Sequence, residues 1–262
     1  MAHWNPELYL RFGGERTRAA ADLLARVVVP TPARVIDLGC GPGNSAALLR
    51  ARWPAADVTG LDRDPAMLSA ARASGPGVRW VEADAATWAA DGAFDVVFSN
   101  AALQWLPDHA AVLGRWFAAV APGGALAVQL PVVHPRSPLH RLVQEVAGSF
   151  GVGGAVAVCH EPGFYYDVLA PLAGRIDLWE TEYGHVTDGP DAVLTWLTGT
   201  RLRPILAALP DGDARRRFEN SLRQRLAAAY PRRADGRVLF PFPRLFFVAY
   251  RTRPAVTPGA AG

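Results

Sequence analysis

The run VIDLGCGPGNS, residues 35–45, places three glycines directly after a short apolar segment, and this arrangement constrains the fold more than any other feature. The apolar residues predict a buried strand, and the run AALLRARW that follows predicts a helix. Gly39, Gly41 and Gly43 allow a sharp turn and let a ligand approach the main chain where a Cβ would block it. Strand, glycine loop and helix together predict a nucleotide-type site at the carboxyl end of a parallel strand.

The spacing of the glycines indicates which ligand the loop would take. A dinucleotide fingerprint reads G-x-G-x-x-G, but the spacing here is G-x-G-x-G, and Asn44 stands where the third glycine of that fingerprint would fall. Asp37, two residues before the first glycine, would repel a pyrophosphate and suits a ligand that carries an ammonium and a sulfonium group. The loop resembles motif I of the class I S-adenosylmethionine-dependent methyltransferases, which implies Asp37, the three glycines and Asn44 as cofactor-binding residues.

A second predicted strand ends in an acid, as such a cofactor site requires. Residues 58–61 predict the strand, and Asp62 follows it about twenty residues past the glycine loop, where a carboxylate would accept from the ribose hydroxyls. Asp64 is a good N-cap, so a helix is expected to begin immediately after it. Met67, on the first turn of that helix, would lie against the adenine ring.

Two more predicted strands follow in the same order. Asp84 ends the third, where it would bond the adenine amino group with Ala85 beside it, and Asn100 stands at the tip of the fourth. Residues 122–124, Pro-Gly-Gly, stop a helix before a fifth strand. As an alternative, the two strand-ending acids would serve only as helix or turn caps, and the methionine only as core. Because two successive predicted strands each end in an acid, the pattern favours the cofactor site over this alternative.

Composition limits the class of protein. The chain has 262 residues, half of them hydrophobic, which predicts one large domain or a domain with insertions. Its apolar runs fall short of the ~18–20 residues of a membrane span, and the N-terminus lacks the pattern of an export signal. Cys40 and Cys159 form neither a disulfide framework nor a metal site. We therefore expect a cytoplasmic monomer that uses no metal and binds no membrane.

Every basic side chain is an arginine, and the arginines concentrate in residues 201–244. A basic segment indicates nucleic-acid binding in some proteins. We expect no nucleic-acid partner here, because the pattern favours a solvated helical face. The residues of that face are Arg215, Arg216, Arg217, Arg223 and Arg225.

The order of elements predicts an α/β fold: a Rossmann-like seven-stranded, mostly parallel sheet with helices on both faces and an inserted α-helical cap. The cap is expected to cover the carboxyl ends of the strands, where substrates bind. The whole chain, 1–262, is interpreted as a single methyltransferase domain. Its core is expected at about 16–131, 172–186 and 238–252, the cap insertions at about 132–171 and 187–237, and a flexible tail at 253–262.

Several motifs resemble those of the trans-aconitate 2-methyltransferases nearly end to end. They are WNPELYLRF with Arg16 and Arg18, DLGCGPGNS, FSNAALQWLPDH, LAPGGALAVQLP, FYYDVLAP, DLWETEYGHV, GTRLRP and AAYPRRADGRVLFPFPRLFFVA. The resemblance is weakest through SFGVGGAVAVCHEPG, so the role of the 149–163 loop stays open. The resemblance implies S-adenosylmethionine as the methyl donor and one carboxylate of trans-aconitate, a small tricarboxylate, as the acceptor.

A carboxylate acceptor agrees with what the sequence lacks. It is already an anion at neutral pH and needs no general base, so positioning alone would drive a direct in-line transfer. Gln104 and Trp105, after the fourth strand, are the predicted positioning residues. Arginine matches a carboxylate bidentately and stays charged. The predicted substrate-binding residues are the arginines Arg16, Arg203 and Arg244 with Tyr9, Tyr166 and His185.

Other interpretations stay open at this point. Each arginine would otherwise pair with a nearby acid such as Glu180 or Asp235, and His185 would be a packing residue. The acceptor would otherwise be another small carboxylic acid or malonyl carrier protein. A different class is a non-catalytic protein that binds S-adenosylmethionine or nucleic acid. The sequence leaves open which carboxylate is esterified.

Overall fold

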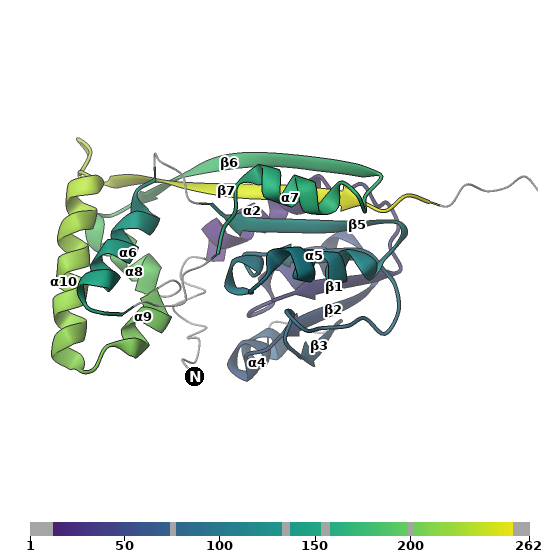
Figure 1. Ribbon diagram of the computed structural model, residues 1–262, viewed down its shortest axis with the longest axis horizontal. Helices are drawn as coiled ribbons and strands as arrows, with labels where there is room; N and C mark the ends of the chain where they lie inside the picture. The colour runs from purple at the N-terminus through teal and green to yellow at the C-terminus, as the bar shows by residue number, and fades with distance from the viewer. Residues whose placement is uncertain (1–12, 74–76, 133–136, 153–157, 199–201, 254–262) are drawn as a thin grey trace, which may run out of the picture.

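The computed structural model describes residues 13–73, 77–132, 137–152, 158–198 and 202–253. These residues form one seven-stranded sheet from β1 (Arg34–Leu38), β2 (Asp57–Asp62), β3 (Val78–Glu82), β4 (Phe94–Asn100), β5 (Val120–Pro131), β6 (Arg175–Thr187) and β7 (Val238–Tyr250). The strand order is β3-β2-β1-β4-β5-β7-β6 (Figure 1). Only β7 runs antiparallel to its neighbours, β5 and β6. The predicted α/β fold with a mostly parallel sheet is confirmed.

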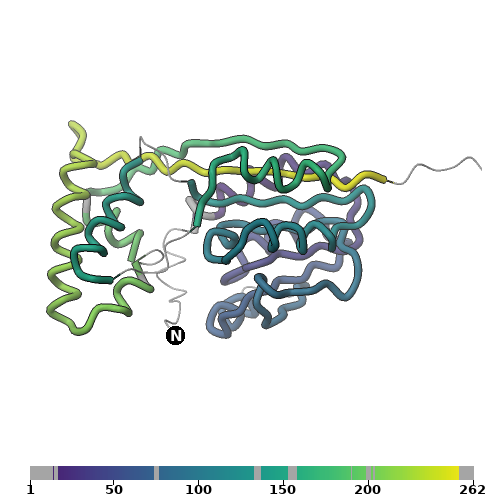
Figure 2. Tube along the Cα trace, viewed as in Figure 1, coloured from purple at the N-terminus to yellow at the C-terminus, as the bar shows by residue number. Residues whose placement is uncertain are grey.

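Helices cover both faces of this sheet (Figures 1 and 2). They are α2 (Gly13–Ala25), α3 (Asn44–Arg52), α4 (Pro65–Ala73), η1 (Leu103–Trp105), α5 (His109–Ala118) and α7 (Pro162–Leu169). One face packs against α2 and α3, and the other against α5 and α7. Alternation along β1 sends Val35 to the α2 face and Ile36 to the α5 face. β1 is therefore buried on both sides, as its mostly apolar sequence predicts, and Asp37 is the one carboxylate within it.

A group of further helices forms a cap with its own core. These helices are α6 (Leu139–Ser149), α8 (Pro190–Thr198), α9 (Leu202–Ala208) and α10 (Gly212–Ala229). Their buried side chains, among them Leu142, Leu197 and Phe218, form one cluster apart from the sheet helices. Figure 1 shows the cap at one end of β6 and β7. β5 pairs with β7 only from Arg244 onward, so the two longer strands carry the cap on a two-stranded arm.

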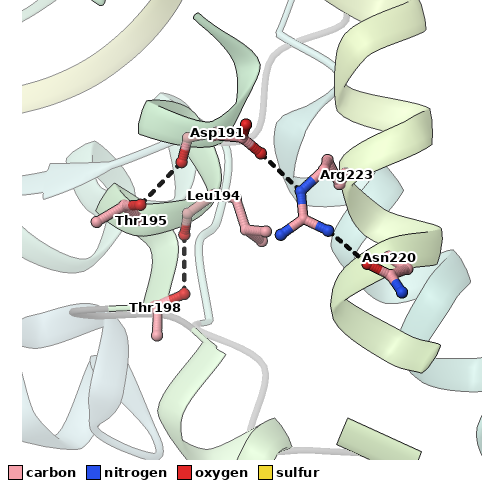
Figure 3. Close-up of polar contacts among 6 residues, drawn as sticks. All are labelled: Asp191, Leu194, Thr195, Thr198, Asn220 and Arg223. Atoms are coloured by element: carbon pink, nitrogen blue, oxygen red, sulfur yellow. Dashed lines mark hydrogen bonds and ion pairs between the residues drawn. The ribbon is translucent and has the colours of Figure 1, made fainter. Parts of the chain in front are cut away.

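Ion pairs join the cap helices to one another. Arg223 on α10 donates to the Asp191 carboxylate of α8 at 2.6 Å and also to the Asn220 amide oxygen (Figure 3). Arg225 lies 3.0 Å from Glu145 of α6. These side chains are 38–76% exposed, so each pair stabilises the cap by no more than ~1 kcal/mol. The helix predicted for this arginine-rich stretch is present.

One detail differs from the expected division into core and cap. The first predicted insertion, 132–171, includes α7, but α7 packs on the core, where Tyr165 stacks on Phe247 at 5.4 Å. β7 starts at Val238 and passes through Pro241 and Pro243. A proline has no N–H to donate to a neighbouring strand, so it is tolerated in this stretch, where β7 has β6 as its only strand partner in the described chain.

No described helix is both long and apolar enough to span a bilayer.

Candidate active site

The glycine loop turns from β1 into α3 through left-handed backbone at Gly39 and Gly41, whose φ angles are 74° and 54°. The N–H groups of Gly39 and Cys40 donate to the Leu61 carbonyl at 2.8 and 2.9 Å, which holds the loop over the end of β2. A Cβ on Gly39 would lie 2.3 Å from the Ala102 Cβ, whereas a Cβ on Gly41 would meet no described atom within 4 Å. The main chain at Gly41 is therefore open to a ligand.

Asp37 places a buried carboxylate beneath this loop. One of its oxygens accepts from the Ser45 hydroxyl at 2.6 Å, and the other has no hydrogen-bond partner among the described residues. Burial raises the pKa of the Asp37 carboxyl to about 7. A cation beside the free oxygen would favour the charged form and lower that pKa again. The carboxylate therefore fits a ligand that carries an ammonium group.

Asp62 is the last residue of β2, as predicted, whereas Asp84 lies two residues past the end of β3 at Glu82. Both carboxylates already accept backbone hydrogen bonds. The Asp62 carboxylate accepts from the N–H groups of Gly41 and Asp64 at 2.8 and 2.9 Å, so it braces the glycine loop. Asp84 accepts from the Ala86 N–H at 2.8 Å. Both acids thus have the turn-capping role that the sequence left open. A carboxylate has about four lone-pair sites, so these bonds still leave room for ribose or adenine donors.

The other predicted cofactor-binding residues lie around the same edge. Gly43 caps α3, and the Asn44 amide donates to the Thr17 hydroxyl of α2 at 3.3 Å. Met67 and Ala85 are buried. Asn100, at the tip of β4, has a buried side-chain oxygen without a partner in the described ranges. All the predicted cofactor positions lie at or just after the carboxyl ends of the parallel strands β1 to β4, so they share one edge of the sheet.

A band of polar side chains crosses the sheet from this edge. In the strand register, Asn100 pairs with Gln129, and Pro131, two residues further along β5, pairs with Arg244. The alternation along each strand places Asp37, Asn100, Gln129 and Arg244 on the face that packs against α2. The band therefore joins the glycine-loop end of the sheet to the arm that carries the cap.

Arg244 is the buried cation of this band, with only 5% of its surface exposed. Its Nη1 donates to the Gln129 amide oxygen at 3.3 Å, and its guanidinium lies 4.4 Å from the centre of the Phe242 ring. His185 lies 5.7 Å from the same ring, and its Nε2 has no hydrogen-bond partner in the described chain. Burial, with Arg244 and Arg18 nearby, lowers the His185 pKa to about 4. At neutral pH this histidine is therefore uncharged.

Gln104 and Trp105 lie in η1, directly after the tip of β4. Gln104 is buried, and its amide donates to the Ala101 carbonyl at 2.6 Å. Its own backbone carbonyl accepts from the Val158 N–H at 2.8 Å. Ala101 has a φ of 55°, a left-handed conformation that costs an alanine ~1–2 kcal/mol. Such strain often accompanies functional sites, and here it turns the chain away from the sheet edge.

A buried aromatic network supports the segment behind η1. The Tyr165 hydroxyl bonds His109 Nδ1 at 3.0 Å and accepts from the His160 N–H at 3.2 Å. The neighbouring thiol of Cys159 donates to the Pro131 carbonyl at 2.9 Å. The network therefore ties the start of α7 to α5 and to the end of β5.

Nowhere in the described ranges do three or more His, Cys, Asp or Glu side chains gather as metal ligands would.

The structure does not bring all the predicted substrate residues together. Arg244 and His185 lie near the same Phe242 ring, but Tyr166 is 53% exposed on α7, which covers the opposite face of the sheet. Tyr9 lies outside the described residues. Arg16 belongs to α2 and Arg203 to α9, and their side chains lie outside the described part.

Sequence reasoning missed Gln129, which is fully buried beside Arg244. Its only signal in the sequence is that an amide interrupts the otherwise apolar run LAVQLP. A buried amide needs hydrogen-bond partners, so a glutamine in such a run indicates a polar contact within the core.

The chain is similar to known methyltransferases. A methyltransferase domain model matches residues 35–124. A trans-aconitate 2-methyltransferase from Methylobacterium radiotolerans is 49% identical over 258 residues, which cover 95% of this chain and 98% of that protein. One of the same name from Azoarcus sp. is 48% identical, over 96% of this chain and 100% of that protein.

Solved structures show the same fold at low sequence identity. YcgJ from Bacillus subtilis has a TM-score of 0.62 at 12% identity, over 90% of this chain and 99% of that chain. A Haemonchus contortus phosphoethanolamine N-methyltransferase 2, solved in complex with S-adenosyl-L-methionine, has a TM-score of 0.59 at 17% identity. That match covers 94% of this chain and 56% of the other.

Proposed function

The chain belongs to the trans-aconitate 2-methyltransferase family and is a methyltransferase, and we propose that it transfers the methyl group of S-adenosylmethionine to one carboxylate of trans-aconitate. The products are the monomethyl ester and S-adenosylhomocysteine. One observation carries the acceptor class: the buried guanidinium of Arg244 lies on the same sheet face as Asp37. The polar band thus has a guanidinium at one end, which suits an anionic acceptor, and a carboxylate at the other end, which suits the cationic methyl donor.

The cofactor end of the band fits S-adenosylmethionine. When bound, the cofactor supplies an electrophilic methyl group on a sulfonium. The free oxygen of Asp37 would hold its ammonium group, and the open main chain at Gly41 would lie beside it. Asp62 and Asp84 would accept from the ribose and the adenine, with Met67 as a buried support beneath the ring.

The acceptor end needs no general base. A free carboxylate is ionised at neutral pH, so the residues around it have only to desolvate and aim it. Arg244 would anchor a carboxylate, and uncharged His185 beside it would donate a hydrogen bond without adding charge. Arg16, Arg203 and Tyr9 remain proposed partners of the other carboxylates. Gln104 and Trp105 would form the wall at which the methyl group passes.

A panel of acceptors tests this function. Purified protein with S-adenosylmethionine is offered trans-aconitate, cis-aconitate, citrate, isopropylmalate and malonyl carrier protein, and any ester is identified by mass and NMR. We expect monomethyl trans-aconitate as the main product. Turnover of malonyl carrier protein alone would contradict the proposed acceptor, and tight cofactor binding without turnover of any acid would contradict catalysis.

The role of Arg244 has its own test. Arg244→Lys keeps the charge but loses the forked geometry, so we expect kcat/KM for trans-aconitate to fall by roughly 10- to 100-fold. The dissociation constant for S-adenosylmethionine should stay unchanged. Arg223→Lys makes the same chemical change on the surface of α10 and should leave both constants unchanged. Unchanged KM and kcat in Arg244→Lys would remove Arg244 from the acceptor site.

A further inference from the structure

Gln129 occupies the centre of the polar band. It is 0% exposed, and it lies between Asn100 on β4 and the β7 strand that carries Arg244. The Ala101 N–H donates to its backbone carbonyl at 2.9 Å, which ties this point of β5 to the turn after β4. The side chain therefore stands between the predicted cofactor end and the predicted acceptor end.

Arg244 determines how the Gln129 amide is oriented. A guanidinium can only donate hydrogen bonds, so the Gln129 atom that faces Arg244 Nη1 at 3.3 Å must be the oxygen. The amide nitrogen then points away from Arg244. This nitrogen is buried and has no hydrogen-bond partner among the described residues. A buried donor without an acceptor is unfavourable, so the arrangement indicates that an acceptor atom arrives with a ligand.

We propose that Gln129 is a substrate-binding residue that orients the reacting carboxylate, an inference that rests on the function proposed above. Its amide nitrogen donates to the carboxylate oxygen that does not attack, which leaves the other oxygen free to face the methyl group. In the transfer, a lone pair of the attacking oxygen forms the O–C bond, and the electron pair of the broken S–C bond stays on sulfur. No proton moves. Gln129 thus selects for an acceptor that offers two equivalent oxygens.

Two variants test the amide with opposite chemistry. Gln129→Met keeps the length of the side chain and removes the donor, so kcat/KM for trans-aconitate should fall by roughly 10- to 100-fold. Gln129→Glu places a carboxyl beside Arg244 and repels the substrate, so the loss at pH 8 should exceed 100-fold, estimated from the cost of a like charge. Protonating that introduced carboxyl would restore a donor. Its kcat/KM should therefore rise as the pH falls, whereas wild type stays flat.

Ser99→Ala is the matched control. Ser99 is a neighbouring buried polar residue on β4, and its hydroxyl donates to the Leu38 carbonyl on the opposite face of the sheet. It should lower thermal stability without changing KM for trans-aconitate. All variants should keep the wild-type dissociation constant for S-adenosylmethionine.

The results distinguish the two proposals. If wild type does not methylate trans-aconitate, the proposed function is wrong and the role of Gln129 falls with it. If wild type turns over and kcat/KM of Gln129→Met stays within threefold, Gln129 does not bind the substrate, and only this inference is overturned. If Gln129→Met does not fold, Gln129→Glu tests the inference instead. A kcat/KM of Gln129→Glu that equals the wild-type value and does not change with pH would also overturn the inference.

Discussion

Replacing Asp37 by Asn should stabilise the protein while it abolishes cofactor binding. The buried carboxyl has its pKa raised from 3.8 to about 7 by desolvation. The unfolded chain therefore releases this proton near pH 4 and the folded chain only near pH 7. Between these values the folded state binds more protons, so the free energy of unfolding falls as the pH rises. The loss is complete above the folded-state pKa.

The size of the effect follows from the shift. About three pH units at about 1.4 kcal/mol each give a loss of up to ~4 kcal/mol between pH 4 and pH 8. Asn cannot ionise, but it buries an amide whose second donor needs a partner, which takes back ~1–2 kcal/mol. Asp37→Asn should therefore be about 2–3 kcal/mol more stable than wild type at pH 8, by the same arithmetic, and no more stable at pH 5.

Urea denaturation of both proteins at pH 5, 6, 7 and 8 measures this difference. Asp57→Asn, which changes an exposed carboxylate at the start of β2, serves as the control and should show no such trend. Calorimetry should show that wild type binds S-adenosylmethionine more tightly above pH 7 than below it, because only the ionised carboxylate attracts the ammonium group. A stability difference between Asp37→Asn and wild type that does not change with pH would refute the reasoning.

Three further predictions concern the loop, the buried network and the chemistry. Gly41→Ala should weaken S-adenosylmethionine binding at least tenfold and destabilise the protein by only ~1–2 kcal/mol, since the new Cβ enters open space. Gly39→Ala should cost more stability, because its Cβ would collide with Ala102. Equal free energies of unfolding for the two variants would contradict this. Tyr165→Phe should cost ~2 kcal/mol in urea denaturation because buried His109 and partly buried His160 both lose their bond to the hydroxyl, while Tyr166→Phe, at an exposed position, should change little. Finally, kcat should be nearly flat from about pH 6 to 8.5, since no proton is removed; a steep rise in stopped-time assays would indicate a different acceptor.

The arrangement of the proposed cofactor end was predictable because its determinants are local. The glycine spacing, Asp37 and the strand-ending acids lie within a few residues of the strands that position them, and strand and helix periods can be read from short windows. For the same reason the seven-stranded α/β fold follows from the order of the elements. The relatives at 48–49% identity agree with the family that the motifs resemble.

Only the tertiary structure shows which side chains lie at the proposed acceptor end. Asn100, Gln129, His185 and Arg244 come from four different strands, and the sheet places them on one face with β7 inserted antiparallel between β5 and β6. No short window contains that register, so a glutamine in an apolar run gave no sign that a guanidinium would fix its orientation. Burial likewise depends on all the surrounding elements together. It is burial, and not the identity of the residue, that raises the pKa of Asp37 and keeps His185 uncharged.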